Sequence, residues 1–375
     1  MYPCFIIQSL GPGGAERVLT ILANSWAEKD WPVRLLTFDN GEDPPFFPLH
    51  QAIDHHPLGL PVGKRGGLGG LLRNLKRVLF LRRMLKRISA DAVISFIDRT
   101  NVVTLLAGLG LGLPVIVAER TDPAMLPSGK LWNILCRSIY PLAARVVVQS
   151  PEAADYYRLR LGKKPVVIPN PVARPEQMPM EDFRLSRPSL IAVGRFTVEK
   201  GFDCLLEAFA RVAFRHPDWT LTIFGDGPLR SALEKQCKNL GLQERVKMPG
   251  LMVNVQAALE QADLFVLPSR FEGFPNALCE AMACGVASIA TDCPSGPRQI
   301  IRHQVDGILV PNEDVDALAL TMDRLMSDPV LRQRLGKRAV EVVDRFSVEK
   351  IVGMWEILLD QVVNVHRGPS GSRAF

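Results

Sequence analysis

Short apolar runs rich in Val, Ile and Leu alternate with helix-length segments along nearly the whole chain. Runs of about five such residues are typical of strands buried on both faces, and strands separated by helices form parallel sheets. The alternation therefore predicts an α/β fold of the doubly wound kind, with helices on both faces of each sheet. The expected strand runs are, in chain order, CFIIQSL, VRLLTFD, DAVISFI, VIVAE, RVVVQS, PVVIPN, LIAVG, LTIFG, RVKMPG, DLFVLPS, ASIATD and GILVP.

A polar stretch with two prolines, ARPEQMPMEDFRLSR at 173–187, divides this alternation into two halves. A chain of 375 residues is long enough for about two domains of ordinary size. We therefore expect one Rossmann-like domain over 1–185, a second over 186–345 and a disordered tail over 366–375. Ligands of such sheets bind at the carboxyl ends of strands, here in a central cleft that both domains would face.

The composition is that of a soluble globular protein with uneven charge. The first 185 residues hold 23 Lys and Arg against 16 Asp and Glu, so the net charge of +6 originates there. The seven cysteines are scattered without a C-x-x-C pair, which suits reduced thiols in the cytosol and argues against a zinc site. The start lacks a basic segment, and the longest uncharged run, Val102–Ala118, is broken by glycine and proline. We expect neither a secretory signal nor a membrane span.

Two cations bracketed by glycines follow the first expected strand of the second domain. The segment GRFTVEKG, Gly194–Gly201, carries Arg195 and Lys200 where a strand gives way to a helix. Taken alone, these eight residues read as a solvated turn. A guanidinium fork and a flexible ammonium at the carboxyl end of a strand are nevertheless well suited to bind a diphosphate. The neighbouring motifs decide between the two interpretations.

A pair of glutamates lies further along, in the stretch LPSRFEGFPNALCEAMACG. Seven residues separate Glu272 from Glu280, and Pro275 suits the start of a helix whose first amides point outward. Because this helix is otherwise apolar, a charged side chain on it needs a partner, and sugar or ribose hydroxyls would serve.

A glycine-rich loop, GPGGAERV, ends the first expected strand and opens a helix. Glycines allow close approach of a ligand, and helix N-terminal amides favour phosphate. Together with Asp39 this loop also imitates a dinucleotide-binding fingerprint, but Glu16 occupies the third glycine position. The chain offers no set of residues for hydride transfer, so NAD binding remains the weaker alternative.

Taken in order, these motifs resemble those of GT-B glycosyltransferases of family 4. The resemblance rests on GGAERV, the G-R-x-x-x-x-K-G segment, the strand end IFGDGP and the pair Glu272 and Glu280, and it covers nearly the entire chain. It extends to a final helix at 346–365, expected to return to the N-terminal domain. The segment TDCPSGPRQII, Thr291–Ile301, looks like the branch that acts on lipid-linked surface polysaccharide or N-glycan precursors.

The resemblance implies a nucleotide-sugar site and a role for each matching residue. Arg195 and Lys200 would contact the diphosphate, Glu272 the donor sugar and Glu280 the ribose, which makes Arg195, Lys200 and Glu272 the predicted catalytic residues. Family members retain the anomeric configuration, and neither a metal nor another cofactor is expected. The other predicted donor-binding residues are Gly13, Gly14, Gly194, Phe274, Asn276 and Ala277.

The acceptor would bind the N-terminal domain, where one segment is strongly basic. Residues 64–87 hold nine Lys and Arg and no acidic residue, with leucines at helical spacing. An ordinary surface helix, a helix on an anionic membrane and a nucleic-acid site compete; the membrane is favoured, and nucleic acid is disfavoured because no aromatic platform accompanies the charge. Where many relatives carry a histidine, this chain has Glu119, Arg120 and Asp122. The candidate acceptor or membrane residues are Arg73, Lys76, Arg77, Arg82, Arg83 and Arg120.

The sequence thus predicts a retaining, metal-independent glycosyltransferase on the inner face of the cytoplasmic membrane. It would move a hexose or N-acetylhexosamine from a nucleotide sugar, with UDP as the expected carrier, to a polyprenyl-diphosphate-linked saccharide. A soluble GT-B enzyme with a small acceptor is the alternative. A non-catalytic nucleotide-sugar-binding subunit is a further one, which the presence of all four charged donor-site residues disfavours.

Overall fold

The computed structural model describes residues 1–60, 68–120, 130–161, 165–175, 184–252 and 254–367. The chain forms two compact units: Met1–Pro171 together with Val348–Phe375, and Val172–Ser347. The division therefore falls before the expected boundary near 185, because the amide of Val172 donates to Phe346 O, 2.8 Å away. Of the expected tail, His366 and Arg367 end the last helix, and 368–375 lie outside the described residues.

The first unit is built on a parallel sheet. In the described part of the chain it has seven strands in the order β3-β2-β1-β4-β5-β6-β7. The apolar runs predicted for this half all form strands, but β3, with the sequence DHHP, was not predicted because it is a short polar strand at the sheet edge. The strands are β1 Pro3–Ile7, β2 Arg34–Thr37, β3 Asp54–Pro57, β4 Ala92–Phe96, β5 Val115–Ala118, β6 Arg145–Val148 and β7 Val166–Val167.

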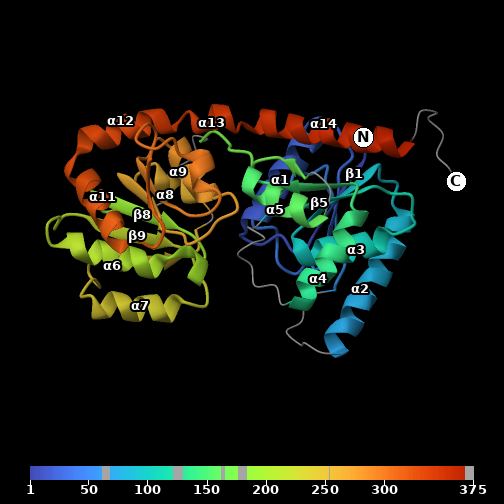
Figure 1. Ribbon diagram of the computed structural model, residues 1–375, viewed down its shortest axis with the longest axis horizontal. Coiled ribbons are helices and arrows are strands. Elements are labelled where there is room, and N and C mark those ends of the chain that lie inside the picture. Colours follow the sequence, from blue (N-terminus) through green and yellow to red (C-terminus); the bar gives the residue numbers. More distant parts are fainter. Residues whose placement is uncertain (61–67, 121–129, 162–164, 176–183, 253, 368–375) are drawn as a thin grey trace. The chain divides into compact units, whose positions relative to one another are not determined.

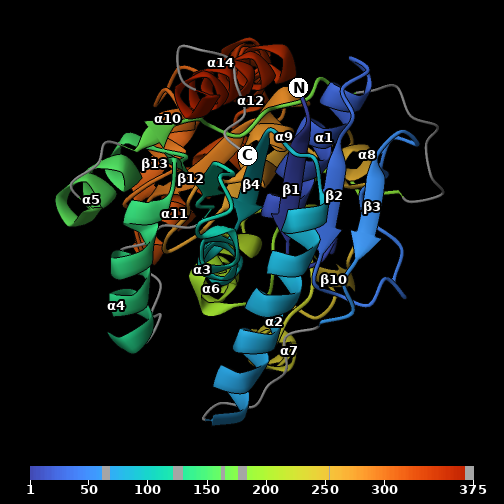
Figure 2. The ribbon, with the colours of Figure 1, turned by 90° about the vertical axis from the view of Figure 1, so that its right-hand side faces the viewer.

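Helices cover both faces of this sheet (Figures 1 and 2). One face carries α1 and α14, whose buried side chains join a core around Phe5, Trp26 and Trp355. The C-terminal helix α14 is thus part of the first unit. On the other face, α2 and α3 lie side by side over a core around Ile6 and Phe38 (Figure 2). The helices are α1 Gly14–Ala27, α2 Leu68–Arg87, α3 Asp98–Gly108, α4 Lys130–Ile139, the 3₁₀ turn η1 Tyr140–Leu142, α5 Pro151–Leu161 and α14 Val348–Arg367.

The second unit repeats the design with a parallel sheet in the order β10-β9-β8-β11-β12-β13. All six of its predicted runs form strands. They are β8 Ser189–Val193, β9 Thr220–Phe224, β10 Val246–Gly250, β11 Leu264–Leu267, β12 Ser288–Asp292 and β13 Ile308–Pro311. The helical segments are η2 Val198–Lys200, α6 Phe202–Ala213, α7 Arg230–Asn239, α8 Val255–Leu259, α9 Asn276–Ala283, α10 Pro297–Ile300, α11 Val315–Ser327, α12 Pro329–Ala339 and α13 Val342–Arg345.

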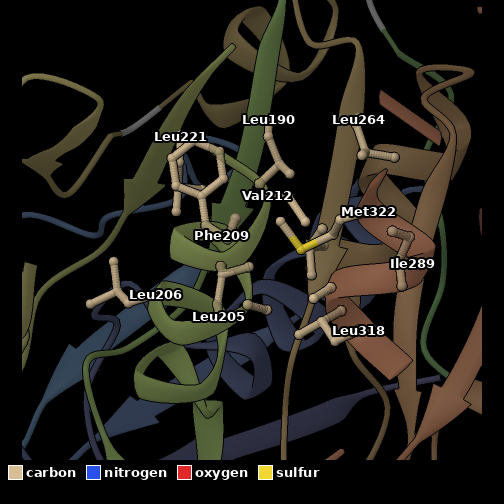
Figure 3. Packing of buried hydrophobic residues seen from close by; sticks show 14 of the residues in the cluster. Leu190, Leu205, Leu206, Phe209, Val212, Leu221, Leu264, Ile289, Leu318 and Met322 are labelled. Carbon is tan, nitrogen blue, oxygen red and sulfur yellow. The ribbon is translucent and has the colours of Figure 1, made fainter. Parts of the chain in front are cut away.

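Successive residues of the central strand β8 face opposite sides of this sheet, as strand geometry requires. Leu190 lies in the core formed with α6 and α11, where Phe209 and Met322 pack (Figure 3). Ile191 lies in the opposite core, formed with α8 and α9. Because every side chain of β8 up to Ala192 is buried, the strand is a rigid support for the loop that follows it.

Candidate nucleotide-sugar site

The loops that follow β8, β9, β11 and β12 gather at one edge of the second unit. These strands are parallel neighbours, so their carboxyl ends share that edge. Strand order reverses beside β8, because the chain runs from β8 outward to β9 and β10 and then returns to β11 on the other side. Such a reversal leaves a crevice between the loops of the two central strands, where doubly wound sheets bind ligands. Gly194–Gly201 follows β8 and Pro268–Pro275 follows β11, so both sequence motifs lie at this point.

Gly201 brings these two loops into contact. It adopts φ +62°, and a Cβ there would lie 2.1 Å from Pro268 O. Only glycine combines this conformation with so close an approach. A Cβ at Gly194 would in turn lie 3.3 Å from Lys200 Cδ, so the stem of Lys200 crosses the end of β8. The glycines that bracket the segment therefore direct the Lys200 ammonium toward the loop after β11.

There the ammonium meets Glu272, with 2.6 Å between Lys200 Nζ and Glu272 Oε1. The Glu272 side chain is 8% exposed and that of Lys200 23% exposed. Ser269 Oγ donates to the same carboxylate oxygen at 2.6 Å. A largely buried carboxylate requires such partners, because burial otherwise penalises its charge. The structure thus brings together one predicted diphosphate ligand and the predicted sugar ligand.

Arg270 also connects the loop after β11 to the segment after β8. Its guanidinium donates to both carboxylate oxygens of Asp203, at 2.9 and 2.6 Å, and to Val198 O at 2.7 Å. Its own amide donates to Glu199 O. This hydrogen bonding lowers the pKa of Asp203 and raises that of Arg270. Arg270 was not among the predicted site residues, although its position two residues before Glu272 is the signal that could have suggested it.

The remaining predicted residues of the second unit divide between surface and core. Arg195 is exposed, and within the described residues its side chain forms no hydrogen bond or ion pair. Phe274 is buried, with its ring edge-on to Phe346 at 5.3 Å between centroids, so it anchors the loop in the core. Pro275 caps α9, which begins with Asn276 and Ala277. Glu280 lies one turn further along α9 and is half-buried.

The first unit carries Gly13 and Gly14 where β1 leads into α1. Gly13 is the N-cap of α1, and a Cβ on it would lie 2.0 Å from Glu16 Oε2, so glycine here lets Glu16 fold back over the helix start. Strand order also reverses in this sheet, between β1 and β4, and the loop after β1 lies at that reversal.

Three of the candidate acceptor residues are engaged inside the first unit. Arg77 is buried and donates through Nε to Leu60 O at 2.9 Å. Arg82 donates to Ala107 O and Leu109 O, at 3.0 and 2.6 Å, and so caps the end of α3. A row of cations in sequence does not reveal which side chains turn inward. On α2, Arg73, Lys76 and Arg83 therefore remain as candidates for contact with an acceptor or a membrane. Lys64 and Arg65 lie outside the described residues.

Arg120, the third of them, is also buried, stacked on Phe96 at 4.7 Å and on Trp355 at 5.7 Å from the ring centroids. Its Nη1 donates to Asn170 Oδ1 at 2.8 Å. Burial lowers its pKa to about 9. In the described part of the chain its Nε and Nη2 have no hydrogen-bond partner. The side chain therefore ties β5 to β4 and α14.

Beside it, Glu119 is buried under η1 and α3. Tyr140 Oη and Asn101 Nδ2 both donate to Glu119 Oε1. Burial nevertheless dominates these bonds and raises the pKa of Glu119 to about 7. In the ranges that the structure describes, no three His, Cys, Asp or Glu side chains gather as metal ligands would, and no helix is long and apolar enough to cross a bilayer.

Two parallel-stranded Rossmann-like units of this kind form the GT-B fold. Comparison with known families agrees: residues 12–174 match the model of Glycosyltransferase Family 4 and residues 173–342 that of Glycosyl transferases group 1. The chain belongs to this family of glycosyltransferases.

Three known proteins illustrate the relationship. One is a Campylobacter jejuni enzyme named GalNAc-α-(1→4)-GalNAc-α-(1→3)-diNAcBac-PP-undecaprenol α-1,4-N-acetyl-D-galactosaminyltransferase, 30% identical over 96% of this chain and 98% of its own length. The exopolysaccharide phosphotransferase SCO2592 of Streptomyces coelicolor is 33% identical over 77% of this chain, which spans only 30% of that protein. The sucrose-phosphate synthase of Thermosynechococcus elongatus shares the fold, with a TM-score of 0.82, 22% identity and coverage of 96% and 98% of the two chains.

Proposed function

We propose that this glycosyltransferase moves a hexose or N-acetylhexosamine from a UDP-sugar to a polyprenyl-diphosphate-linked saccharide, with retention of anomeric configuration and without a metal ion. The observation that carries the proposal is the near end-to-end relationship to the Campylobacter enzyme, whose name specifies an undecaprenyl-diphosphate-linked acceptor and an N-acetylgalactosaminyl donor group. The likeness to a sucrose-phosphate synthase concerns the fold alone and does not favour a water-soluble acceptor.

On the donor side, Arg195 and Lys200 would hold the diphosphate, while Glu272 binds sugar hydroxyls and Glu280 the ribose. Breaking the bond between sugar and diphosphate builds negative charge on the leaving oxygen, and cations fixed in advance stabilise that charge. Support comes from the position of Lys200 at the strand reversal, where its stem crosses Gly194. Arg195 is exposed and without a side-chain partner among the described residues, so it is available to a second phosphate oxygen.

The ion pair with Glu272 gives Lys200 a second role. A diphosphate near Lys200 would compete with Glu272 for the ammonium and draw it away. The Glu272 carboxylate could then accept hydrogen bonds from the sugar hydroxyls. The two halves of the donor would then be recognised by two groups that neutralise each other while the site is empty. Cations and helix-end amides supply the charge stabilisation in this proposal, and no metal ligand set is required.

On the acceptor side, α2 presents one exposed face suited to a membrane. Leu72, Leu75 and Leu79 are 58%, 53% and 49% exposed and share this face with the exposed Arg83 and Lys86. The face is thus apolar in its first half and cationic toward its end. An amphipathic helix of this kind lies in the headgroup region of anionic bilayers. We place the enzyme at the inner face of the cytoplasmic membrane on this basis.

A donor screen tests the proposal. Purified protein is incubated with membranes that carry polyprenyl-diphosphate-linked saccharides and with UDP-, GDP- or ADP-sugars in turn, and nucleotide release is measured. We expect release from a UDP-sugar that depends on the lipid-linked saccharide. Nuclear magnetic resonance of the isolated product then gives the anomeric configuration. Activity on a water-soluble acceptor with none on the lipid would support the small-acceptor alternative, and no release with any donor would overturn the proposal.

A further inference from the structure

Three buried hydroxyl groups converge on the loop that carries Glu272. Ser269 Oγ donates to Glu272 Oε1 at 2.6 Å, Ser295 Oγ donates to Glu272 O, and Thr291 Oγ1 donates to Ser269 O. The residues Ser269, Ser295 and Thr291 are 0%, 2% and 4% exposed, respectively. Ser269 follows β11, whereas Thr291 lies in the neighbouring strand β12 and Ser295 in the segment after it. The hydroxyls therefore link the Glu272 loop to a second strand of the sheet.

The backbone after β12 supports the same loop. Gly296 adopts φ +90°, and a Cβ there would lie 2.9 Å from Pro275 Cδ and 3.2 Å from Glu272 Cβ. The segment Thr291–Gly296 thus lies directly against Glu272. Arg270, two residues before Glu272, ties the start of the loop to Asp203. The position of Glu272 is therefore determined by contacts with both segments.

In the described part of the chain, the hydrogen bonds of the Glu272 side chain all involve one of its two carboxylate oxygens. Among the described residues, Lys200 and Ser269 both bind Oε1, and no bond reaches Oε2. This arrangement fixes the rotation of the carboxylate and offers Oε2 to a hydroxyl of the donor. If a diphosphate draws Lys200 away, Ser269 is the donor that remains, because its hydroxyl is neutral and buried.

We infer that Ser269, Thr291 and Ser295 are positioning residues that orient Glu272 toward the donor sugar. The inference deepens the proposed function and rests on it, since it assigns a role in sugar recognition to hydroxyls that bond to Glu272 and Ser269. The segment TDCPSG, Thr291–Gly296, then forms the wall against which the Glu272 loop is held. Loss of one hydroxyl should weaken recognition of the sugar and leave the affinity for the nucleotide unchanged.

The experiment compares the binding of UDP with that of UDP-N-acetylgalactosamine by calorimetry, and then measures transfer to the lipid-linked saccharide. Ser269→Ala removes a hydrogen bond to a charged group. We therefore expect kcat or the affinity for the UDP-sugar to fall by about 10- to 100-fold. Affinity for UDP alone should remain that of the wild type. Ser295→Ala should show the same separation to a smaller degree, because Ser295 binds the backbone of Glu272.

Two matched substitutions separate positioning from a general loss of stability. Thr291→Val removes the hydroxyl at nearly constant volume, and Thr291→Ser keeps it, so only the valine variant should lose sugar transfer. Ser288→Ala removes another buried hydroxyl of β12, which donates to Val286 O at 3.0 Å, away from Glu272. It should leave both affinities unchanged.

The outcomes distinguish this inference from the proposed function. If the wild type binds UDP-N-acetylgalactosamine and transfers sugar, but Ser269→Ala behaves like Ser288→Ala, the positioning role is wrong and the proposed function stands. If Ser269→Ala weakens UDP and UDP-sugar equally, the hydroxyl supports the whole site and the inference is also overturned. If the wild type neither binds nor transfers from any nucleotide sugar, the proposed function fails first.

Discussion

The ammonium of Lys200 and the carboxylate of Glu272 form an ion pair, 2.6 Å from Nζ to Oε1, across the loops that follow β8 and β11. These strands are adjacent although the two residues are 72 positions apart in sequence. The pair exists because the order of strands reverses at β8 and because Gly201 permits contact with Pro268. In the proposed function, donor binding would separate this pair, so that Lys200 contacts the diphosphate and Glu272 the sugar.

Replacement of Lys200 by alanine should abolish most of the transfer activity. Removal of one preorganised group that stabilises leaving-group charge typically costs about 100-fold or more in rate. Steady-state nucleotide release measures the loss, and circular dichroism checks the fold. Lys235→Ala is the control, since Lys235 is an exposed residue of α7. Equal activity of the two variants would remove Lys200 from the diphosphate site.

Arg270 should contribute more to stability than a surface ion pair does. Arg270→Ala removes the bonds of the guanidinium to Asp203, Val198 O and Glu313, so we expect a loss of about 1–3 kcal/mol in the free energy of unfolding of the second unit. The matched change Arg211→Ala breaks an exposed pair with Asp316 and should cost about 0–1 kcal/mol. Urea titration monitored by fluorescence gives both values. Similar losses in the two variants would show that Arg270 does not clamp the loops.

Gly201→Ala should destabilise the site, whereas the same change elsewhere should not. A residue with a side chain held at φ +62° costs about 1–3 kcal/mol, and contact with Pro268 O would also displace the neighbouring Lys200. Gly353 in α14 has no atom within 4 Å of an added Cβ, so Gly353→Ala should stabilise that helix by about 0.5–1 kcal/mol. Thermal unfolding and nucleotide release are measured for both. A fully active Gly201→Ala enzyme would contradict the close contact between the loops.

Glu119 should make stability depend on pH. Its pKa rises from an ordinary 4.5 to about 7 in the folded state, so between these values the folded chain binds more protons than the unfolded chain. Stability from this group is therefore lost as the pH rises from 4.5 to 7, by an amount on the order of 3 kcal/mol. Glu119→Gln keeps an acceptor for Tyr140 but does not titrate. Its melting temperature, relative to that of the wild type, should increase across this window; a constant difference would show that Glu119 titrates normally.

The exposed face of α2 should bind anionic vesicles. Replacing Leu72, Leu75 and Leu79 together by serine should abolish flotation with vesicles of anionic phospholipid, because these three leucines are the apolar part of the exposed face of the helix. Reversing Arg83 and Lys86 to glutamate should weaken flotation most at low salt. Leu159→Ser changes a still more exposed leucine, on α5, and should have no effect. If both variants still float with the vesicles, α2 is not the part of the protein that binds the membrane.

Much of the fold followed from the sequence because strands buried on both faces leave a simple pattern of short apolar runs. The predicted runs all form strands. β3 was missed because its sequence, DHHP, carries no such pattern and is held by pairing with β2 alone. The first segment of the first unit ends at Pro171 because the amide of Val172 donates to Phe346 O, a contact between residues far apart in sequence.

That Lys200 and Glu272 lie close together was predictable in outline, because both belong to recognisable motifs at the carboxyl ends of neighbouring strands. The supports of Glu272 were not, since Ser269, Thr291 and Ser295 are ordinary hydroxyl residues whose convergence depends on the pairing of β11 with β12. The cations of α2 show the converse. Helical spacing identified the helix, but Arg77 and Arg82 reach carbonyl groups from loops and from α3, which no periodicity records.

The proposed function is tested most directly by transfer of radiolabelled sugar from a UDP-sugar to a polyprenyl-diphosphate-linked saccharide, followed by extraction into organic solvent. We expect label in the organic phase with the wild type, and none above background with Lys200→Ala or with acceptor omitted. Nucleotide release with all of the label left in water would refute the lipid-linked acceptor, and equal extraction with Lys200→Ala would refute the role of Lys200.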